Sequence, residues 1–368
     1  MFEYNVHTNE VNWIALEKYD WVQPLKGCPQ NPVYHGEGDV WNHTKMVIEY
    51  LISMSEFAEL KPEEKEILYA SALFHDIAKP ICVKEEDGVI ISKNHSKIGR
   101  KKAREILCNF NIDFDTREQI CNLVGFHGLP VWFMDKKESA KEVIRASLLI
   151  DTKLLYLLSK ADVNGRICED SEELNLKVDL FRESCKELGC YSKEKHFHND
   201  HSRFYYFSKE NSFMNYEAYD DTKFKVILMS GLPGSGKDYW IEKNNKENLP
   251  IISLDEIRKE LKIKPHKEQG KVVQTAKEKA KEFMRKKQDF IWNATNTTKL
   301  MRSQLINLFR VYGAKIRIVY IDITPDKSIE NMNKRNRKVS LTVVQNLYKK
   351  LDIPDLSECH ELTIEKII

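Results

Sequence analysis

The chain has 368 residues, of which 42% are hydrophobic and 31% are charged, and its formal net charge is +2. These values are typical of a folded protein with two or three domains and exclude a largely disordered chain. Because the overall charge is nearly balanced, any surface for nucleic acid must be local. No segment approaches the roughly 18 uninterrupted apolar residues of a membrane-spanning helix.

The cysteines and the first residues favour a cytoplasmic protein. The eight cysteines include no C-x-x-C pair, and the closest two, Cys185 and Cys190, do not have zinc-ribbon spacing. The opening MFEYNVHTNEVNW lacks the basic and apolar regions of a secretory signal. We therefore expect reduced, mostly buried thiols, a cytoplasmic location and no membrane association.

The first half of the chain has a helical pattern. Residues 1–40 show no clear period and are expected to form an irregular leader that packs on the helical region after it. From Trp41 to about Leu188, apolar residues recur at helical spacing. One exception, residues 79–96, has the character of a two-stranded ribbon that turns at Asp87-Gly88. The pattern predicts an all-α domain with a small β excursion.

Residues of metal-ligand type lie on three of these helical segments. They are His43, the doublet His75-Asp76, and Asp162, each beside an apolar stripe, so all could turn toward one interior. Imidazole and carboxylate together suit a divalent transition metal. A metal held in this way lowers the pKa of bound water and directs hydroxide at phosphorus. Singly, each residue could equally be a packed or surface side chain.

These residues resemble the motifs of the HD phosphohydrolase superfamily over roughly residues 35–190. The matching stretches are WNHTKMV (His43), LFHDIAKP (His75 and Asp76), NHSKIG (His95), VGFHGLP (His127) and LSKADVNGR (Asp162). The resemblance implies metal-dependent hydrolysis of phosphate esters, with Asp76 in the catalytic centre. His43, His75, Asp76 and Asp162 would hold a first metal, and His95 and His127 a second, or else contact the phosphate. Lys79 and Arg166 follow the motifs closely, and we expect them to bind substrate phosphate.

Residues 191–222 separate two patterns. They are rich in Tyr, Phe, Asn and Asp and poor in Gly, Ser and Pro, so we expect an ordered aromatic connector between a domain over 1–190 and a second over 223–368. After them, apolar runs at 226–231, 250–255, 289–296 and 315–323 alternate with helical segments, and a charged helical segment closes near Pro354. This alternation predicts an α/β domain with a parallel sheet covered on both faces.

The first of these runs leads directly into a phosphate-binding motif. The residues are GLPGSGK at 231–237, in which Gly231, Gly234, Ser235, Gly236 and Lys237 form G-x-x-x-x-G-K between a strand and a helix. Glycines let backbone N–H groups close around phosphate oxygens, and the lysine adds a charge toward the β and γ phosphates. We expect ATP with Mg²⁺ here. Asp238 stands where Ser or Thr usually binds Mg²⁺.

The next segment indicates phosphoryl transfer. Asp255 is expected at the end of a strand, with Arg258 one turn later, so both can face one cleft. A carboxylate there can accept a proton from an attacking hydroxyl, and a guanidinium can hold an anionic acceptor. The alternative is an aspartate that caps a helix beside an exposed arginine, and Asp255 could have both roles.

Two later segments support the same chemistry. WNATNTTKLMR places Asn293, Asn296 and Arg302 at the end of another strand, near where nucleotides bind in open α/β sheets. NKRNRKVS places Arg335 and Arg337 in a basic stretch that could form a lid over the ATP phosphates. A solvated basic surface is the alternative for this stretch.

Residues 224–352 resemble the polynucleotide 5′-hydroxyl kinase family, through GLPGSGK, Asp255-x-x-Arg258, ATN at 294–296 and the basic stretch. The resemblance implies that Asp255 is the general base and that Arg258 contacts the 3′-phosphate of the acceptor. Lys237 and Arg335 would stabilise the γ-phosphoryl group. Asp238 departs from the family pattern, as does Asn331, which stands about where such lids carry an additional arginine.

The order of the two halves is similar to the HD-Pnk type of bacterial RNA end-healing enzyme. This resemblance implies removal of 2′,3′-cyclic phosphate or 2′-phosphate ends, ATP-dependent phosphorylation of 5′-OH ends of RNA or DNA, and a separate RNA ligase acting downstream. Two alternatives remain open. One is an HD nucleotidase fused to a kinase of nucleosides or metabolites, and the other is an HD hydrolase gated by a P-loop module that only senses ATP.

Overall fold

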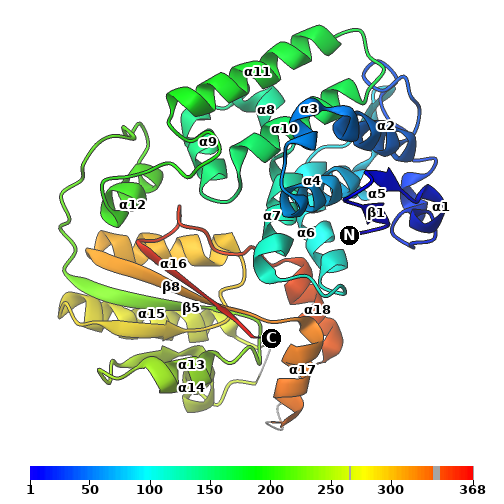
Figure 1. Ribbon diagram of the computed structural model, residues 1–368. Helices are drawn as coiled ribbons and strands as arrows, with labels where there is room; N and C mark the ends of the chain where they lie inside the picture. Colours follow the sequence, from blue (N-terminus) through cyan, green and yellow to red (C-terminus); the bar gives the residue numbers. More distant parts are fainter. Residues whose placement is uncertain (265–266, 335–339, 368) are drawn as a thin grey trace. The chain divides into compact units, whose positions relative to one another are not determined.

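The computed structural model describes residues 1–264, 267–334 and 340–367. The chain divides into two compact units, Met1–His196 and Phe197–Ile368. The first is helical and the second contains a parallel sheet with helices, as the sequence predicts (Figure 1). No helix within the described ranges combines the length and apolar character needed to cross a membrane.

The first unit is built from helices with two short strand pairs. The strands are β1 (Tyr4–Asn5) with β2 (Glu10–Val11), and β3 (Lys84–Glu86) with β4 (Val89–Ile91). The helices are α1 (Trp13–Leu16), η1 (Gln23–Leu25), α2 (Val40–Ser53), α3 (Ser55–Ala58), α4 (Pro62–Phe74), α5 (Lys79–Cys82), α6 (His95–Leu107), α7 (Phe114–Phe126), α8 (Leu129–Trp132), η2 (Phe133–Asp135), α9 (Ser139–Ser147), α10 (Thr152–Asn164) and α11 (Ser171–Glu187). The ribbon predicted at Asp87-Gly88 is confirmed by the β3–β4 pairing.

The core of this unit lies among α2, α4, α7 and α10. Helix α4 packs against each of the other three, and α10 packs against α2 and α7. The leader contributes to the same core, because Phe2, Tyr4 and Leu16 are buried in it. The Phe2 ring meets Phe74 edge to face at 5.2 Å between ring centroids. The predicted packing of the leader on the helices is therefore confirmed.

The second unit has a five-stranded sheet in the order β6-β7-β5-β8-β9, with every neighbouring pair parallel. The strands are β5 (Phe224–Gly231), β6 (Ile251–Ser253), β7 (Phe290–Asn293), β8 (Ala314–Asp322) and β9 (Glu361–Lys366). The helices are α12 (Asp200–Ser208), α13 (Lys237–Asn244), α14 (Leu254–Glu260), α15 (Gln269–Arg285), α16 (Lys299–Val311), α17 (Pro325–Lys334) and α18 (Leu341–Lys349). The strand that leads into GLPGSGK is thus the central one.

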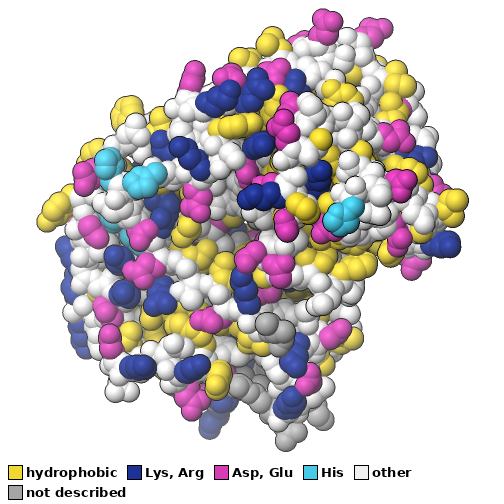
Figure 2. All heavy atoms as spheres, in the orientation of Figure 1, with side chains coloured by type: hydrophobic (Ala, Val, Ile, Leu, Met, Phe, Trp, Pro, Cys, Tyr) yellow, Lys and Arg dark blue, Asp and Glu magenta, His cyan; other side chains and the backbone are white. Residues whose placement is uncertain are grey.

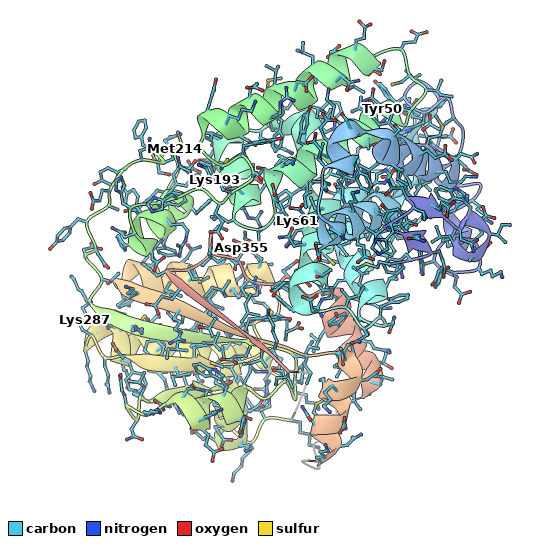
Figure 3. All side chains as sticks on the ribbon, viewed as in Figure 1. Tyr50, Lys61, Lys193, Met214, Lys287 and Asp355 are labelled. Carbon is cyan, nitrogen blue, oxygen red and sulfur yellow. The ribbon has the colours of Figure 1, made fainter. Side chains whose placement is uncertain are left out.

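Both faces of the sheet are buried, because alternate residues of β5 belong to different clusters. Val226 and Leu228 pack with side chains of α14, α15 and α16, whereas Met229 packs with Trp240 and Ile241 of α13. Figure 3 shows side chains filling the space between the sheet and these helices. This double covering explains why β5 reads as a continuous apolar run.

Two features of the second unit go beyond the sequence analysis. The connector contains helix α12 (Asp200–Ser208), which is capped by the side chain of Asn199. The chain also does not close on the helical segment near Pro354, because β9 comes after it and extends the sheet beside β8. The sequence ELTIEK alternates polar and apolar residues, a weak strand signal that suits an edge position with partly buried residues.

Candidate active sites

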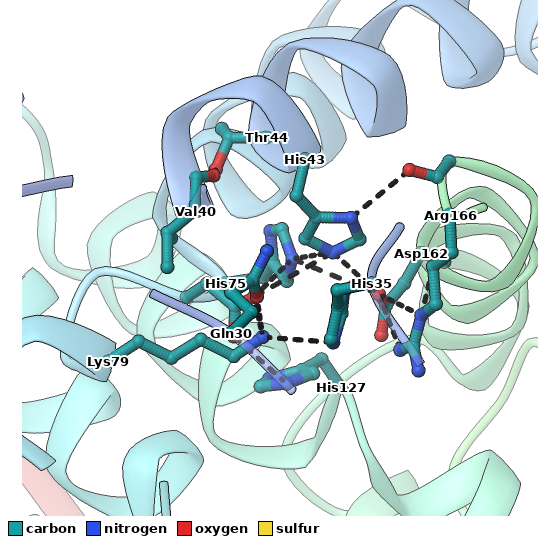
Figure 4. A network of polar contacts seen from close by, with 12 residues as sticks. Gln30, His35, Val40, His43, Thr44, His75, Lys79, His127, Asp162 and Arg166 are labelled. Atoms are coloured by element: carbon teal, nitrogen blue, oxygen red, sulfur yellow. Dashed lines mark hydrogen bonds and ion pairs between the residues drawn. The ribbon is translucent and has the colours of Figure 1, made fainter. Parts of the chain in front are cut away.

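The six predicted metal ligands of the first unit come from the ends and middles of five helices. His43 lies on α2 and Asp162 on α10. His75 follows the last residue of α4, His127 follows the last residue of α7, and His95 begins α6. All except His95, which is about one quarter exposed, are buried. Figure 4 shows His43, His75, His127 and Asp162 around one interior site.

The ligands form two adjacent sets. In the first, the Nε2 atom of His43 lies 3.3 Å from the Nε2 atom of His75 and 3.1 Å from the Oδ1 atom of Asp162. In the second, the Nε2 atoms of His95 and His127 lie 3.1 Å apart. Each set places its potential ligand atoms within 4.8 Å of one another.

Asp76 joins the two sets. Its Oδ2 atom lies 3.2 Å from Nε2 of His75 and 3.7 Å from Nε2 of His43. Its Oδ1 atom lies 3.4 Å from Nε2 of His95 and 4.0 Å from Nε2 of His127. One carboxylate therefore faces both sets, one oxygen to each, so Asp76 would contribute a ligand oxygen to a metal ion held by either set.

The backbone fixes which nitrogen each imidazole presents. Nδ1 of His75, His95 and His127 donates to the carbonyl oxygen three residues earlier, at 2.7–2.8 Å. Nδ1 of His43 donates to the carbonyl oxygen of Gly165 at 3.1 Å. A Cβ at Gly165 would lie 2.6 Å from the backbone of Val47, so only glycine permits this approach. The Nε2 atom of each imidazole therefore carries a lone pair that points toward the other ligand side chains.

This donor set fits divalent metal ions. Lone pairs that face one another at 3.1–3.3 Å repel unless a cation or proton lies between them. Within the described part of the chain, the buried Oδ1 atom of Asp76 has no hydrogen-bond partner, and such an orphaned acceptor is expensive unless a ligand satisfies it. His43, His75, Asp76 and Asp162 would hold one ion, and Asp76, His95 and His127 the other.

The electrostatics keep the carboxylates ionised. Burial raises the pKa of both Asp76 and Asp162, but neighbouring cations more than offset it and hold each pKa below the usual range. For Asp76 the main cation is Lys79, and for Asp162 it is Arg166. Burial, followed by the proximity of His95, lowers the pKa of His127 to about 3. Neutral imidazole and ionised carboxylate are the forms that bind metals.

Lys79 and Arg166, expected to bind phosphate, reach the edge of this cluster. Nζ of Lys79 lies 2.7 Å from Oδ2 of Asp76, and Nη2 of Arg166 lies 2.7 Å from Oδ1 of Asp162. Both cations are therefore held on ligand carboxylates, where they also remain close to any phosphate that approaches the cluster. Their role toward phosphate stays a prediction.

The loop before α2 adds residues that the sequence analysis missed. Oε1 of Glu37 lies 2.8 Å from Nδ1 of His35 and 3.0 Å from Nδ1 of His43. Nε2 of His35 lies 3.4 Å from Nζ of Lys79, which also donates to Gln30 at 2.5 Å. The available signal was a histidine and an acidic residue shortly before the helix of the first ligand. Such a short pattern does not by itself predict a functional site.

The phosphate-binding motif of the second unit has the expected backbone. Gly231, Gly234 and Gly236 have φ values of 144°, 72° and 95°. A Cβ at Gly234 would lie 2.6 Å from the carbonyl oxygen of Ser328 on α17. Asn331, on the same helix, donates to the carbonyl oxygen of Gly234 at 3.1 Å. Asn331 thus braces the loop, although the sequence analysis considered it only for the lid.

Ser235 and Lys237 of this loop are buried, whereas Asp238 after them is exposed. Nζ of Lys237 donates to the carbonyl oxygens of Gly231 and Leu232 at 3.0 and 2.7 Å, and to Oγ of Ser235 at 3.3 Å. Asp238, in the first turn of α13, accepts a hydrogen bond from Asn293 at 2.8 Å. Positive-φ glycines and a lysine at the loop form the cradle that nucleotide phosphates occupy in P-loop proteins.

Asp255 and Arg258 do face one another. Nη1 of Arg258 lies 2.7 Å from Oδ1 of Asp255, and Nη2 donates to Gln269 at 2.8 Å. Asp255 does not end a strand as expected: β6 ends at Ser253, which also caps α14. Asp255 instead lies in the first turn of that helix, with a side chain that is 57% exposed.

Three further predictions have different outcomes. Arg302 is fully buried and pairs with both carboxylate oxygens of Glu358 at 2.8 and 2.9 Å, so it supports the fold and does not face a nucleotide. Asn296 donates to the carbonyl oxygen of Met229 at 2.8 Å and anchors the loop after β7 to the central strand. Arg335 and Arg337 lie outside the described residues.

Comparisons with known proteins agree with this division. Residues 40–150 match the model of the HD domain, and residues 226–354 match a model of the AAA domain. A solved structure of a candidate kinase from Chloroflexus aurantiacus is similar at 15% sequence identity and a TM-score of 0.35, over 39% of this chain and 89% of that chain. The helical unit thus contains a match to the HD domain, together with a His/Asp cluster that could hold metal. An AAA-type P-loop domain follows it and implies binding of a nucleoside triphosphate.

Proposed function

We propose that the protein is a bifunctional enzyme that heals broken RNA ends. The HD unit removes 2′,3′-cyclic phosphate or 2′-phosphate, and the P-loop unit phosphorylates the 5′-OH with ATP, leaving ends that a separate ligase can join. The observation that carries the proposal is the presence, on one chain, of a His/Asp cluster joined by Asp76 and a P-loop accompanied by the exposed Asp255 and its partner Arg258.

In the HD unit, the chain's own residues define where a phosphate can react. Metal ions held by the two ligand sets would supply a Lewis acid and a bound water of lowered pKa. Lys79 and Arg166 stand on opposite flanks of the cluster and can neutralise the non-bridging oxygens of a phosphate (Figure 4). Asp76 directs one oxygen to each set and so keeps the two sets next to one another. Hydrolysis of a cyclic phosphodiester needs these parts and no acceptor other than water.

In the P-loop unit, the lysine and the Asp255–Arg258 pair would act on different reactants. Lys237, released from the carbonyl oxygens that hold it, would contact the β and γ phosphates. Asp255 would accept the proton of the 5′-OH as its oxygen bonds to the γ phosphorus and the bond to the β–γ bridging oxygen breaks. Arg258, steadied by Gln269, would hold a phosphate of the acceptor strand.

The distribution of charged side chains on the face shown in Figure 2 is compatible with a local site for RNA. On this face, the basic and acidic side chains of the described residues are intermingled. We propose that recognition of an RNA end depends on a few contacts near each site. Weak dependence of activity on RNA length is the expected consequence.

The test is to incubate an RNA that carries 2′,3′-cyclic phosphate and 5′-OH ends with ATP and a panel of divalent metals, following both ends. Conversion of both ends supports the proposal. If only free nucleosides accept phosphate, the second unit is a small-molecule kinase. His75→Ala should abolish end hydrolysis and spare phosphorylation, and Lys237→Ala should do the converse. Asp255→Ala should abolish transfer but not ATP binding, whereas a mere ATP sensor would show no transfer even in the wild type.

A further inference from the structure

The carboxylate after the P-loop lysine has a specific partner on the neighbouring strand. Asp238 lies in the first turn of α13, and Asn293 is the last residue of β7. The Nδ2 atom of Asn293 donates to Oδ1 of Asp238 at 2.8 Å. An ionised carboxylate can only accept, so the amide must present its nitrogen to Asp238. The direction of this hydrogen bond is therefore fixed.

The two residues meet because of the sheet topology. Strands β5 and β7 are adjacent and parallel, so the P-loop that follows β5 and the residue that ends β7 lie at the same edge of the sheet. Three hydrogen bonds to carbonyl oxygens hold this edge together: the backbone N–H of Gly231 donates to Thr295, the Ser230 hydroxyl donates to Asn296, and the Asn296 side-chain amide donates to Met229. Asn293 is itself 9% exposed. The amide that contacts Asp238 is thus built into the fold, whereas Asp238 itself is exposed.

Both positions differ from the usual metal site of P-loop enzymes. In that site, a Ser or Thr hydroxyl after the lysine and an Asp from a neighbouring strand hold Mg²⁺. Here the position after the lysine is a carboxylate, and the strand position that contacts it is a neutral amide. Each change alone would alter the charge of the site by one. Together they leave one carboxylate and one neutral oxygen-bearing side chain.

We propose that Asp238, oriented by Asn293, is the carboxylate ligand of the divalent ion that accompanies the nucleotide. The carboxylate and the neutral group have exchanged places between the P-loop helix and the strand. The assignment rests on the proposed use of ATP by this unit. Carboxylate and amide oxygens are ligands that Mg²⁺ and Mn²⁺ accept, so the exchange preserves the chemistry of the site while moving its charge onto α13.

Two simpler explanations compete with this assignment. Asp238 could serve only the helix, because acidic residues are favoured in a first turn. Such a role needs no buried partner on another strand, whereas Asn293 is such a partner. Alternatively, Asp322 at the end of β8 could supply the metal carboxylate. Its Oδ1 atom accepts a hydrogen bond from Tyr320 at 3.1 Å, and β8 is the other neighbour of the P-loop strand.

The experiment measures how far a metal tightens nucleotide binding. The affinity of the full-length protein for a non-hydrolysable ATP analogue is determined by calorimetry in EDTA and in Mg²⁺, and the ratio of the two is compared among variants. The variants are Asp238→Ser, Asn293→Asp, the double exchange and Asp322→Asn, with Glu242→Gln as the matched control. Glu242 is an exposed residue of the same helix. Removing its charge therefore tests whether the loss of any negative charge on the helix has the same effect as the loss of Asp238.

The assignment predicts a distinct pattern. Asp238→Ser should lower the ratio by about 10- to 100-fold and should not weaken binding in EDTA, which also shows that the variant is folded. Asn293→Asp should weaken binding in EDTA because two carboxylates then meet beside the phosphates. The double exchange should bring the ratio back to within about threefold of the wild type. Glu242→Gln and Asp322→Asn should leave it unchanged.

Other outcomes overturn the assignment. If Asp238→Ser keeps the wild-type ratio, or if the double exchange binds the analogue in EDTA but regains no metal dependence, Asp238 is not the ligand. Loss of the ratio in Asp322→Asn alone would transfer the role to Asp322. The proposed function fails separately: a metal-dependent ratio without any phosphorylation of RNA ends would refute the polynucleotide kinase and leave the assignment of Asp238 standing.

Discussion

Glu37 offers the sharpest test of how the HD cluster is organised. Its side chain is 1% exposed and accepts from three donors: Nδ1 of His35 at 2.8 Å, the backbone N–H of Ile167 at 2.9 Å, and Nδ1 of His43 at 3.0 Å, which shares its proton with the carbonyl oxygen of Gly165. Burial raises the pKa of Glu37, but the hydrogen bonds from His35 and His43 more than offset it and hold the pKa below its ordinary value. Glu37 is therefore an ionised positioning residue behind a metal ligand.

The change Glu37→Gln keeps the size of the side chain and removes its charge. The amide has one oxygen in place of two, so an amide N–H must face at least one of the three donors. A hydrogen bond to a charged group contributes about 1.5–3 kcal/mol. Changes behind a metal ligand typically lower metal affinity by about 10- to 100-fold, which corresponds to about 1.4–2.7 kcal/mol. We expect a loss of metal affinity in this range.

The assay is competition between the protein and a chromophoric chelator for Mn²⁺, combined with hydrolysis of a 2′,3′-cyclic phosphate end over a range of metal concentrations. Glu37→Gln should shift the metal dependence to higher concentration and recover most of the rate at saturation. Glu49→Gln, at an exposed position of α2, is the matched control. If Glu37→Gln binds Mn²⁺ as tightly as the wild type, the orienting role is wrong and the residue only supports the loop.

Three predictions concern stability and the P-loop. Burial raises the pKa of Glu118, but Arg104, whose Nη2 atom lies 2.6 Å away, lowers it to about 2. The ion pair should therefore stabilise the fold fully above about pH 4.5. As the pH falls toward 2, the free energy of unfolding should decrease by up to about 3 kcal/mol. Unfolding of Glu118→Gln should depend less on pH across that window. Arg302→Ala should destabilise the second unit by about 3–5 kcal/mol, because it leaves the buried Glu358 carboxylate unpaired, and denaturant unfolding would show it; a loss below about 1 kcal/mol would contradict this account. Gly234→Ala should abolish binding of ATP analogues in calorimetry, since its Cβ would overlap α17.

The sequence was sufficient where chemistry is encoded locally. His43, His75 and Asp76 were found because ligand-type residues stand beside apolar helical stripes, and the P-loop because strand, glycines and helix are contiguous. The position of Asp76 between the two sets could not be predicted, since it depends on where α6 begins and α7 ends in space. The same holds for Glu37, whose importance arises only when its loop folds back on α2 and the end of α10.

Arg302 shows the opposite limit. An arginine shortly after a strand that ends near a P-loop resembles a nucleotide contact in sequence, because the pattern gives its position along the chain but not its direction. In the structure, Nη1 donates to the carbonyl oxygens of Asn296 and Asp352, and the rest of the guanidinium pairs with Glu358. The acidic partner lies 56 residues away, a separation that no local pattern could connect.

In both units, the cations that are predicted to bind phosphate contact oxygen atoms of the chain itself. Lys79 and Arg166 lie on the ligand carboxylates, and Lys237 lies on carbonyl oxygens of its own loop. A phosphate must compete with these partners, which weakens binding of the substrate. Under the proposed reactions, each cation would exchange these oxygens for those of the phosphate, close to where it already lies. Because carboxylates compete more strongly than carbonyl oxygens, the HD unit should favour substrates whose phosphate also contacts bound metal, whereas the P-loop lysine can respond to the nucleotide alone.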